Sequence, residues 1–170
     1  MKAFLLLLVF TWALAFGSFG QSKGKSDKPG DAETLIDRFI GTWRLIEFAN
    51  LDPTTAAWTY PYGRHPKGYF TYTRGGIVNL NISSETPPKI SEDSAKNCNI
   101  NLLSWLDNNA MGYFGTYSID FNRSVVTHHV KGGSLPWYID TDQQRPFALK
   151  GDTLIIGDNK TWKRVLVKEN

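Results

Sequence analysis

Short runs of β-branched and aromatic residues, each ended by a turn, dominate the second half of the chain. These runs span residues 112–119, 124–131, 135–139, 144–150, 153–156 and 161–167. Runs of this length and spacing predict antiparallel strands. Further runs at 41–48, 68–73 and 77–82 raise the total to eight or nine strands, which is typical of a β-sandwich or a β-barrel. The sequence therefore predicts an all-β fold.

Two segments have helical rather than alternating spacing. Residues 31–39 place Leu35, Ile36 and Phe39 on one side of a short helix, and residues 99–109 show a similar pattern. Residues 50–67 contain three prolines and predict an irregular connection. A connection this long is often functional. It either covers the barrel mouth as a lid or packs on the outer wall.

The first 20 residues have the pattern of a secretory signal peptide. Lys2 precedes an apolar run over residues 3–16, and the small residues Ser18 and Gly20 precede the expected cut at Gln21. We therefore expect a secreted or periplasmic protein, with a flexible tail at 21–33 and a folded domain at 34–170. No later apolar run is long enough for a membrane-spanning helix.

Charge and cysteine content exclude some classes of protein. The net charge of +3 is small and dispersed, so nucleic acid is not an expected partner. Cys98 is the only cysteine, which rules out a disulfide within the chain. Three N-x-S/T triplets would accept glycans in a eukaryotic secretory pathway, and they begin at Asn81, Asn122 and Asn159.

Alternation along the strands assigns side chains to the interior. Neighbouring residues of a strand point to opposite faces, so His128 and His129 cannot both face inward. Valines two residues away on either side place His128 inside and His129 outside. Arg145 shares its face with Phe147 and so also points inward. The predicted ligand-binding residues are Tyr72, Tyr117, His128, Arg145 and Phe147.

A mostly apolar cavity with a few polar groups is typical of a small-molecule site. Arg145 would anchor an anionic oxygen, because its planar guanidinium pairs with such groups, and His128 would exchange a proton near neutral pH. Two structural alternatives stay open at this point. Arg145 could instead form a buried pair with Glu47, and the barrel interior could be packed solid.

Several motifs resemble a known family. Gly41-Thr42-Trp43 resembles the G-x-W motif of lipocalins, whose Trp closes the barrel bottom, often beneath an Arg from the last strand, here Arg164. With this triplet, five further motifs in the same order resemble the lipocalin-like domain family over residues 35–167. They are YGRHPKG from Tyr62, FTYT from Phe70, YFGTYSID from Tyr113, VTHHV from Val126 and RPFAL from Arg145.

The resemblance implies an antiparallel up-and-down β-barrel of about eight strands with an internal cavity. The leading expectation is a secreted lipocalin-like protein that binds a small, mostly apolar or amphipathic molecule with one anionic or carbonyl end. One alternative is an isomerase or cyclase, in which His128 is the acid or base and Arg145 stabilises an oxyanion. Another is an interaction protein with a solid barrel. Neither a cofactor motif nor zinc-ligand spacing is present, so we expect no cofactor and no metal.

Overall fold

The computed structural model describes residues 35–97 and 101–169. The expected signal peptide at 1–20, the tail at 21–33 and Cys98 lie outside the described residues. Within the described part of the chain, no helix has the length and apolar character needed to span a membrane.

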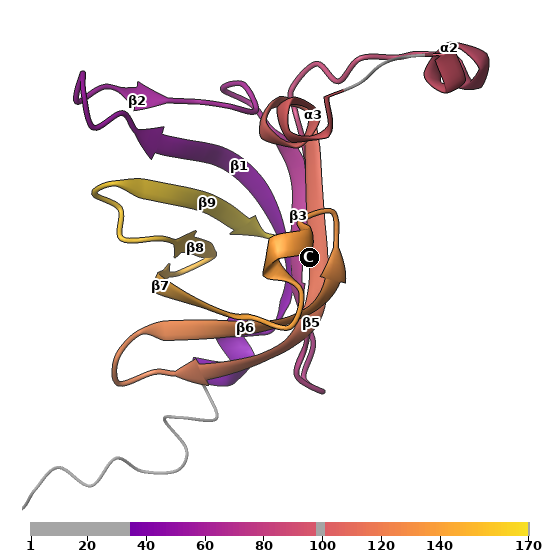
Figure 1. Cartoon of the computed structure of the whole chain (residues 1–170). Coiled ribbons are helices and arrows are strands. Elements are labelled where there is room, and N and C mark those ends of the chain that lie inside the picture. Colours follow the sequence, from indigo (N-terminus) through magenta and orange to yellow (C-terminus); the bar gives the residue numbers. More distant parts are fainter. Residues whose placement is uncertain (1–34, 98–100, 170) are drawn as a thin grey trace, which may run out of the picture.

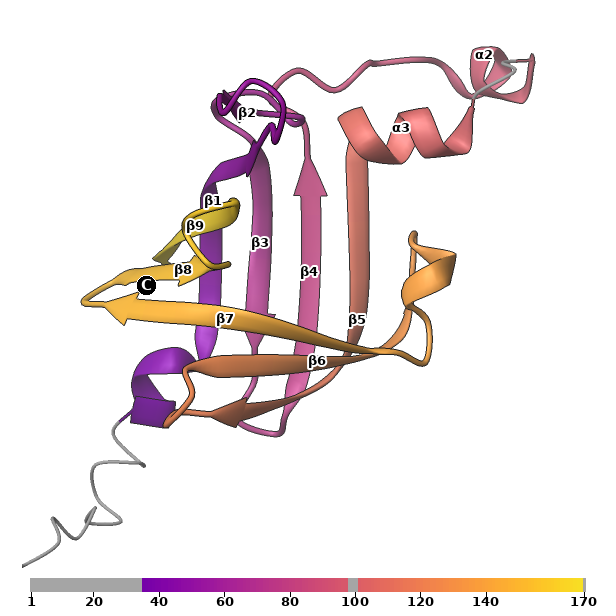
Figure 2. The ribbon, with the colours of Figure 1, turned by 60° about the vertical axis from the view of Figure 1, so that its left-hand side comes forward.

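The architecture is a closed antiparallel β-barrel of eight strands with one short additional strand (Figures 1 and 2). The strands are β1 (Gly41–Leu51), β2 (Trp58–Thr59), β3 (Lys67–Tyr72), β4 (Ile77–Ser83), β5 (Ala110–Asp120), β6 (Val125–Gly133), β7 (Asp142–Lys150), β8 (Thr153–Ile156) and β9 (Trp162–Lys168). Each barrel strand pairs with its neighbour in sequence order, and β9 pairs with β1 to close the sheet. The predicted all-β up-and-down barrel is confirmed.

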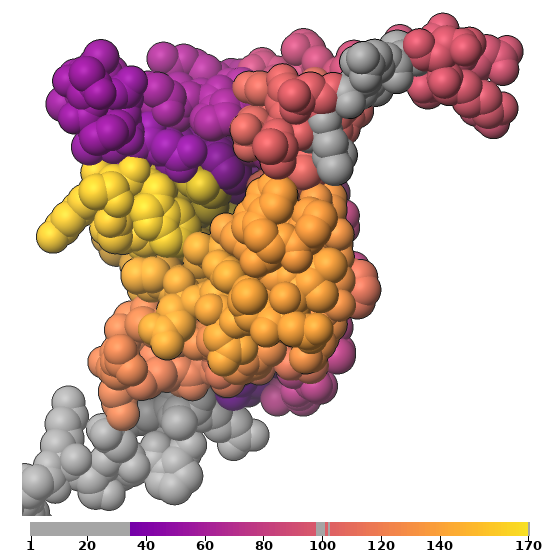
Figure 3. Space-filling model, in the orientation of Figure 1, coloured from indigo at the N-terminus to yellow at the C-terminus, as the bar shows by residue number. Residues whose placement is uncertain are grey.

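Short helices lie at the ends of the barrel. Residues 35–39 are helical and lie next to one end, whereas α3 (Leu102–Asn108) lies with β2 at the other end (Figure 2). The polar helix α2 (Glu92–Asn97) has no buried residue and projects away from the barrel (Figure 3). Helices were predicted over residues 31–39 and 99–109, within which residues 35–39 and 102–108 are helical, but no helix was predicted at α2.

Strand β1 departs from simple alternation. Strict alternation would place Trp43, Leu45 and Glu47 on one face and Phe48 on the other, but Phe48 is buried together with Trp43 and Leu45. A bulge between Leu45 and Glu47 in the pairing with β9 is the reason, because one extra residue shifts the later side chains to the opposite face. Glu47 therefore lies outside the core.

Two segments differ from the predicted secondary structure. Residues 135–139 were expected to form a strand, but Pro136–Tyr138 is the 3-10 helix η1, with the proline in its first turn. A proline cannot donate to a β-ladder and is well suited to the start of a helix. The connection at 50–67 is not wholly irregular, since Trp58 and Thr59 pair with the end of β1.

Aromatic side chains fill the barrel end next to residues 35–39. We call this group the aromatic plug, and it consists of Phe39, Tyr72, Tyr117 and Phe147. The Phe39 ring centroid lies 4.7 Å from that of Tyr72 and 5.0 Å from that of Phe147. Tyr72 and Tyr117 meet edge to face at 5.1 Å. Such contacts make this end a packed floor rather than an opening.

Trp43 contributes to the closed end, but its cationic partner is not the expected one. The Trp43 Nε1–H donates to the carbonyl oxygen of Phe39 at 2.8 Å, which ties the short helix to β1. Lys168 Nζ lies 4.7 Å from the centroid of the Trp43 ring and donates to the carbonyl oxygens of Arg38 and Ile40. Arg164 was predicted for this position, and that prediction is wrong. In the β1–β9 register Trp43 pairs with Lys168, whereas Arg164 pairs with Phe48 farther along the strands.

Candidate ligand-binding cavity

A cavity of about 730 Å³ occupies the barrel between the plug and the end that carries α3. Its volume is within the range of drug-sized ligand sites. The lining comes from the barrel strands, the 50–67 connection, α3 and η1. It consists of Phe48, Asn50, Pro61, Tyr62, Phe70, Leu80, Ile82, Asp107, Asn108, Met111, Tyr113, His128, Leu135, Trp137, Tyr138, Arg145, Ile156, Trp162 and Arg164. A cavity of this size argues against the alternative of a solid interior.

The long connection contributes only part of its length to the cavity. Pro61 and Tyr62 line it, and the Tyr62 hydroxyl donates to the carbonyl oxygen of Leu106 on α3 at 2.5 Å. Burial raises the pKa of Tyr62 to about 12, so this hydroxyl keeps its proton. Trp58 and Tyr60 instead stack with Lys163 and Arg64 away from the cavity lining. The connection thus forms one side of the rim, with other aromatics packed outside.

Two arginines face the cavity. Arg145 comes from β7, and its Nη2 donates to the Tyr138 hydroxyl at 3.3 Å and to Gln143 Oε1 at 3.2 Å. Arg164 comes from β9, and its Nη1 donates to the carbonyl oxygen of Ala49 at 2.9 Å. Both side chains are partly buried and therefore poorly screened by water. Their charges lie on the same cavity wall.

No carboxylate forms an ion pair with either arginine within the described residues. Asp107 also lines the cavity, but it is exposed at the rim and forms no ion pair with Arg145 or Arg164. The alternative pairing of Arg145 with Glu47 is wrong, because Glu47 Oε1 lies 3.0 Å from Lys163 Nζ. The bulge in β1 accounts for this, since it turns Glu47 away from the interior. The cavity is therefore electropositive.

The Trp162 ring lies next to both arginines. The Cζ atoms of Arg145 and Arg164 lie 5.5 Å and 5.3 Å from its centroid. Arg164 also stacks on the Phe48 ring. Burial, followed by repulsion from Arg145, lowers the pKa of Arg164 to about 9, which still leaves it cationic at neutral pH. Aromatic faces thus hold two like charges near each other.

His128 lies beside the cavity between two tyrosines. Its Nε2 is 3.0 Å from the Tyr72 hydroxyl, and its Nδ1 is 2.8 Å from the Tyr113 hydroxyl. The side chain is 1% exposed. Burial, followed by the charge of Arg145, lowers the pKa of His128 to about 3, so the ring is neutral at physiological pH. Both ring nitrogens are already hydrogen-bonded, which argues against direct proton transfer to a ligand.

The predicted site residues separate into two groups. His128 and Arg145 line the cavity, whereas Tyr72, Tyr117 and Phe147 belong to the plug beneath it. Tyr72 remains connected to the cavity through its hydrogen bond to His128. The Tyr117 hydroxyl instead donates to the carbonyl oxygen of Thr73.

The predicted ligand-binding residues leave out much of the polar and aromatic cavity wall, including four residues that lie near Arg145 or His128. They are Tyr113, Tyr138, Trp162 and Arg164. Alternation on β5 places Tyr113 on the same face as Tyr117, so a signal for Tyr113 was present. Tyr138 was not predictable in this way, because it lies in η1 rather than in a strand.

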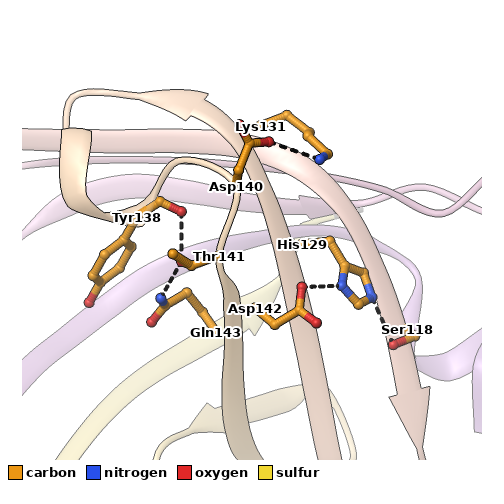
Figure 4. A network of polar contacts seen from close by, with 8 residues as sticks. All are labelled: Ser118, His129, Lys131, Tyr138, Asp140, Thr141, Asp142 and Gln143. Carbon is orange, nitrogen blue, oxygen red and sulfur yellow. Dashed lines mark hydrogen bonds and ion pairs between the residues drawn. The ribbon is translucent and has the colours of Figure 1, made fainter.

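A second polar chain lies on the outer face of the barrel (Figure 4). Ser118 Oγ is 3.1 Å from His129 Nε2, and His129 Nδ1 is 2.6 Å from Asp142 Oδ1. This order resembles that of a hydrolase triad. However, Ser118 is exposed on a paired strand, and none of Ser118, His129 and Asp142 lines the cavity. No cluster of three or more potential metal ligands occurs among the described residues.

Comparison with known proteins decides the family. A family model described as "Lipocalin-like domain" matches residues 40–169. The chain belongs to the lipocalin-like domain family. No curated protein matches it at significant similarity. The match covers every strand of the lipocalin-like barrel, and the fold and family together support a lipocalin-type ligand-binding protein.

Proposed function

We propose that this lipocalin-like protein binds a small, mostly apolar molecule with one anionic end. The observation that carries the proposal is the pair of cavity-facing arginines without an ion-pair partner among the described residues. A buried cation without a counterion is unfavourable, so an anionic ligand would relieve the repulsion between Arg145 and Arg164. Arginine also presents a planar set of donors that matches a carboxylate.

The remainder of the lining supports an apolar body for the ligand. Aromatic and aliphatic side chains form most of the wall, among them Phe70, Leu80 and Ile156. Burying apolar ligand surface against them contributes about 25 cal/mol per Å² before the costs of association. The anionic group would then fix the orientation of the ligand rather than supply most of its affinity.

A series of ligands that differ only in their polar group tests this proposal. We would titrate the purified protein with naphthalene-2-carboxylate, naphthalene-2-methanol and naphthalene-2-methylamine in a calorimeter. Dodecanoate and dodecylamine would provide the same comparison with a flexible body. We expect each carboxylate to bind at least about tenfold more tightly than the matching amine, because two cations attract one and repel the other.

Charge-neutralising variants assign that preference to the cavity. Arg145→Gln and Arg164→Gln should each weaken carboxylate binding about tenfold or more, the value of a hydrogen bond to a charged group. Arg44→Gln is the matched control, because Arg44 lies on the outer wall in an ion pair with Glu169. Equal binding of carboxylate and amine, or no binding of any of the five probes, would refute the proposal.

We extend the proposal to the place where the protein acts. The charged start, apolar run and small residues over 1–20 support export, and a secreted or periplasmic location fits a carrier that meets ligands outside the cytoplasm. N-terminal sequencing of protein isolated from its native cells tests this. Export predicts a chain that begins at Gln21, whereas a retained Met1 in the cytoplasmic fraction would contradict it.

A further inference from the structure

The neutral His128 ring has one N–H donor and one bare nitrogen acceptor. Each nitrogen is within hydrogen-bond distance of one tyrosine hydroxyl, Tyr72 at Nε2 and Tyr113 at Nδ1. One tyrosine must therefore donate to the ring, and the other must accept from it. The tyrosine that accepts keeps its own hydroxyl proton for a different partner. The tautomer of His128 decides which tyrosine that is.

The cavity settles the assignment in favour of one tautomer, because both tyrosines are buried and, of the two, Tyr113 alone lines the cavity. Tyr72 is 1% exposed, lies in the plug, and has His128 Nε2 as the one hydrogen-bond partner of its hydroxyl among the described residues. If Tyr72 accepted from the ring, its own proton would be buried without a conventional acceptor, at a considerable cost. Tyr72 therefore donates to Nε2. The ring proton is then on Nδ1 and is donated to the Tyr113 oxygen.

Tyr113 differs from Tyr72 because it lines the cavity. Its oxygen accepts from His128, and its proton has no acceptor among the described residues other than what the cavity contains. Its ring centroid lies 5.8 Å from that of Tyr138, whose hydroxyl accepts from Arg145. Burial raises the pKa of Tyr113 to about 12, which is consistent with a hydroxyl that remains a donor.

We infer that Tyr113 is a specificity-determining residue that donates its hydroxyl proton to an acceptor oxygen of the ligand. Tyr72 and His128 are positioning residues that fix the direction of this donation. The inference rests on the proposed function and sharpens it. The favoured ligand class has two neighbouring acceptor oxygens, as in a carboxylate, so that one oxygen accepts from Arg145 and the other from Tyr113.

The first test reads the tautomer directly, without any ligand. The ¹⁵N chemical shifts of a neutral histidine ring distinguish a protonated from a bare nitrogen, and ¹⁵N-histidine labelling of the wild-type protein gives them for His128. In the His128→Gln variant the signals of one histidine disappear, and these signals are assigned to His128. We expect the proton on Nδ1. A proton on Nε2 would overturn the inference, because Tyr113 would then donate to the ring and not to the cavity.

The second test measures binding of naphthalene-2-carboxylate. Tyr113→Phe should lower the affinity about 10-fold to 100-fold, the range for a lost hydrogen bond to a charged acceptor. Tyr69→Phe is the matched control, since Tyr69 lies on the outer wall of β3 and is 50% exposed. Unchanged affinity in Tyr113→Phe, with tight binding by the wild type, would overturn the inference and leave the proposed function intact.

Tyr72→Phe separates a positioning role from a merely structural one. Tyr72 does not line the cavity. Removal of its hydroxyl nevertheless leaves His128 Nε2 without a donor and allows the ring proton to move to Nε2. We expect a new His128 tautomer population together with weaker carboxylate binding. Weaker binding with the Nδ1 proton fully retained would contradict the positioning role. Should either tyrosine variant fail to fold, the wild-type tautomer still decides the inference.

Discussion

Two adjacent histidines occupy opposite environments in this barrel. His128 is buried between two tyrosine hydroxyls beside the cavity, whereas His129 lies on the outer face between Ser118 and Asp142. Their contacts are similar in number, but water competes only for those of His129. Hydrogen bonds and ion pairs exposed to water contribute little, while a buried polar group that loses its partner is costly.

This contrast predicts unequal effects of the same substitution. His128→Ala should lower the free energy of unfolding by about 2–4 kcal/mol, since it removes buried packing and leaves the Tyr72 and Tyr113 hydroxyls without their partner. His129→Ala should cost less than about 1 kcal/mol. Urea denaturation of both variants checks this. If His129→Ala lowered the free energy of unfolding as much as His128→Ala, the contrast between a buried His128 and an exposed His129 contact would be contradicted.

The lowered pKa of His128 predicts a dependence of stability on pH. The folded state protonates His128 only near pH 3, whereas the unfolded state does so near 6.5. Between these values the unfolded state binds more protons, so stability should fall as the pH falls from about 6.5 toward 3. Urea denaturation at pH 7 and pH 5 checks this in the wild type and in His128→Gln. The free energy of unfolding should fall less in the variant than in the wild type. Equal losses would contradict a neutral, buried His128.

The inward positions of His128 and Arg145 were predictable from alternation, because β6 and β7 are regular where these residues lie. Which atoms they contact was not. Tyr72 lies 56 residues from His128 in the sequence, the strand register places Tyr117 rather than Tyr113 opposite His128, and Tyr138 lies in a helical turn. Sequence patterns assign a side chain to a face, but they do not fix hydrogen-bond partners brought together by barrel closure.

At the scale of elements, the short helix over residues 35–39 closes the barrel floor. Phe39 is fully buried and packs against the other three rings of the aromatic plug. The Trp43 indole holds the end of this helix through the Phe39 carbonyl oxygen. The helix is too short to be stable alone, so its packing must supply its stability.

Phe39→Ala should therefore destabilise the barrel by about 3–5 kcal/mol, the usual cost of removing a buried aromatic side chain. Leu35→Ala is the matched control from the same helix, where the side chain is only partly buried and should cost less. Thermal or urea unfolding checks the difference. Similar small losses in both variants would show that the helix does not form part of the floor.

Element boundaries were largely predictable, and the exceptions have physical causes. The β1 bulge inserts one residue into an otherwise regular ladder, which reverses the faces of Glu47 and Phe48. That reversal also invalidated the Glu47 pairing with Arg145. The expected strand at 135–139 contains Pro136, which favours the first turn of η1 over a ladder position.

For the whole molecule, ligand binding should raise stability by mass action. At a carboxylate concentration 100 times its Kd, the free energy of unfolding should rise by about 2.7 kcal/mol, because the unfolded chain has no cavity. Thermal unfolding with naphthalene-2-carboxylate should show the increase, and Arg145→Gln should reduce it. An increase of equal size with the amine analogue would point to non-specific apolar binding instead.

The central claim is that the ligand's anionic end meets Arg145 and Tyr113 inside the barrel. A crystal structure of the complex with naphthalene-2-carboxylate tests it most directly. We predict one carboxylate oxygen within hydrogen-bond distance of the Arg145 guanidinium, the other within that distance of the Tyr113 hydroxyl, and the rings against the aromatic wall. A carboxylate that points out past the rim, or a ligand bound on the outer face with an empty cavity, would contradict the claim.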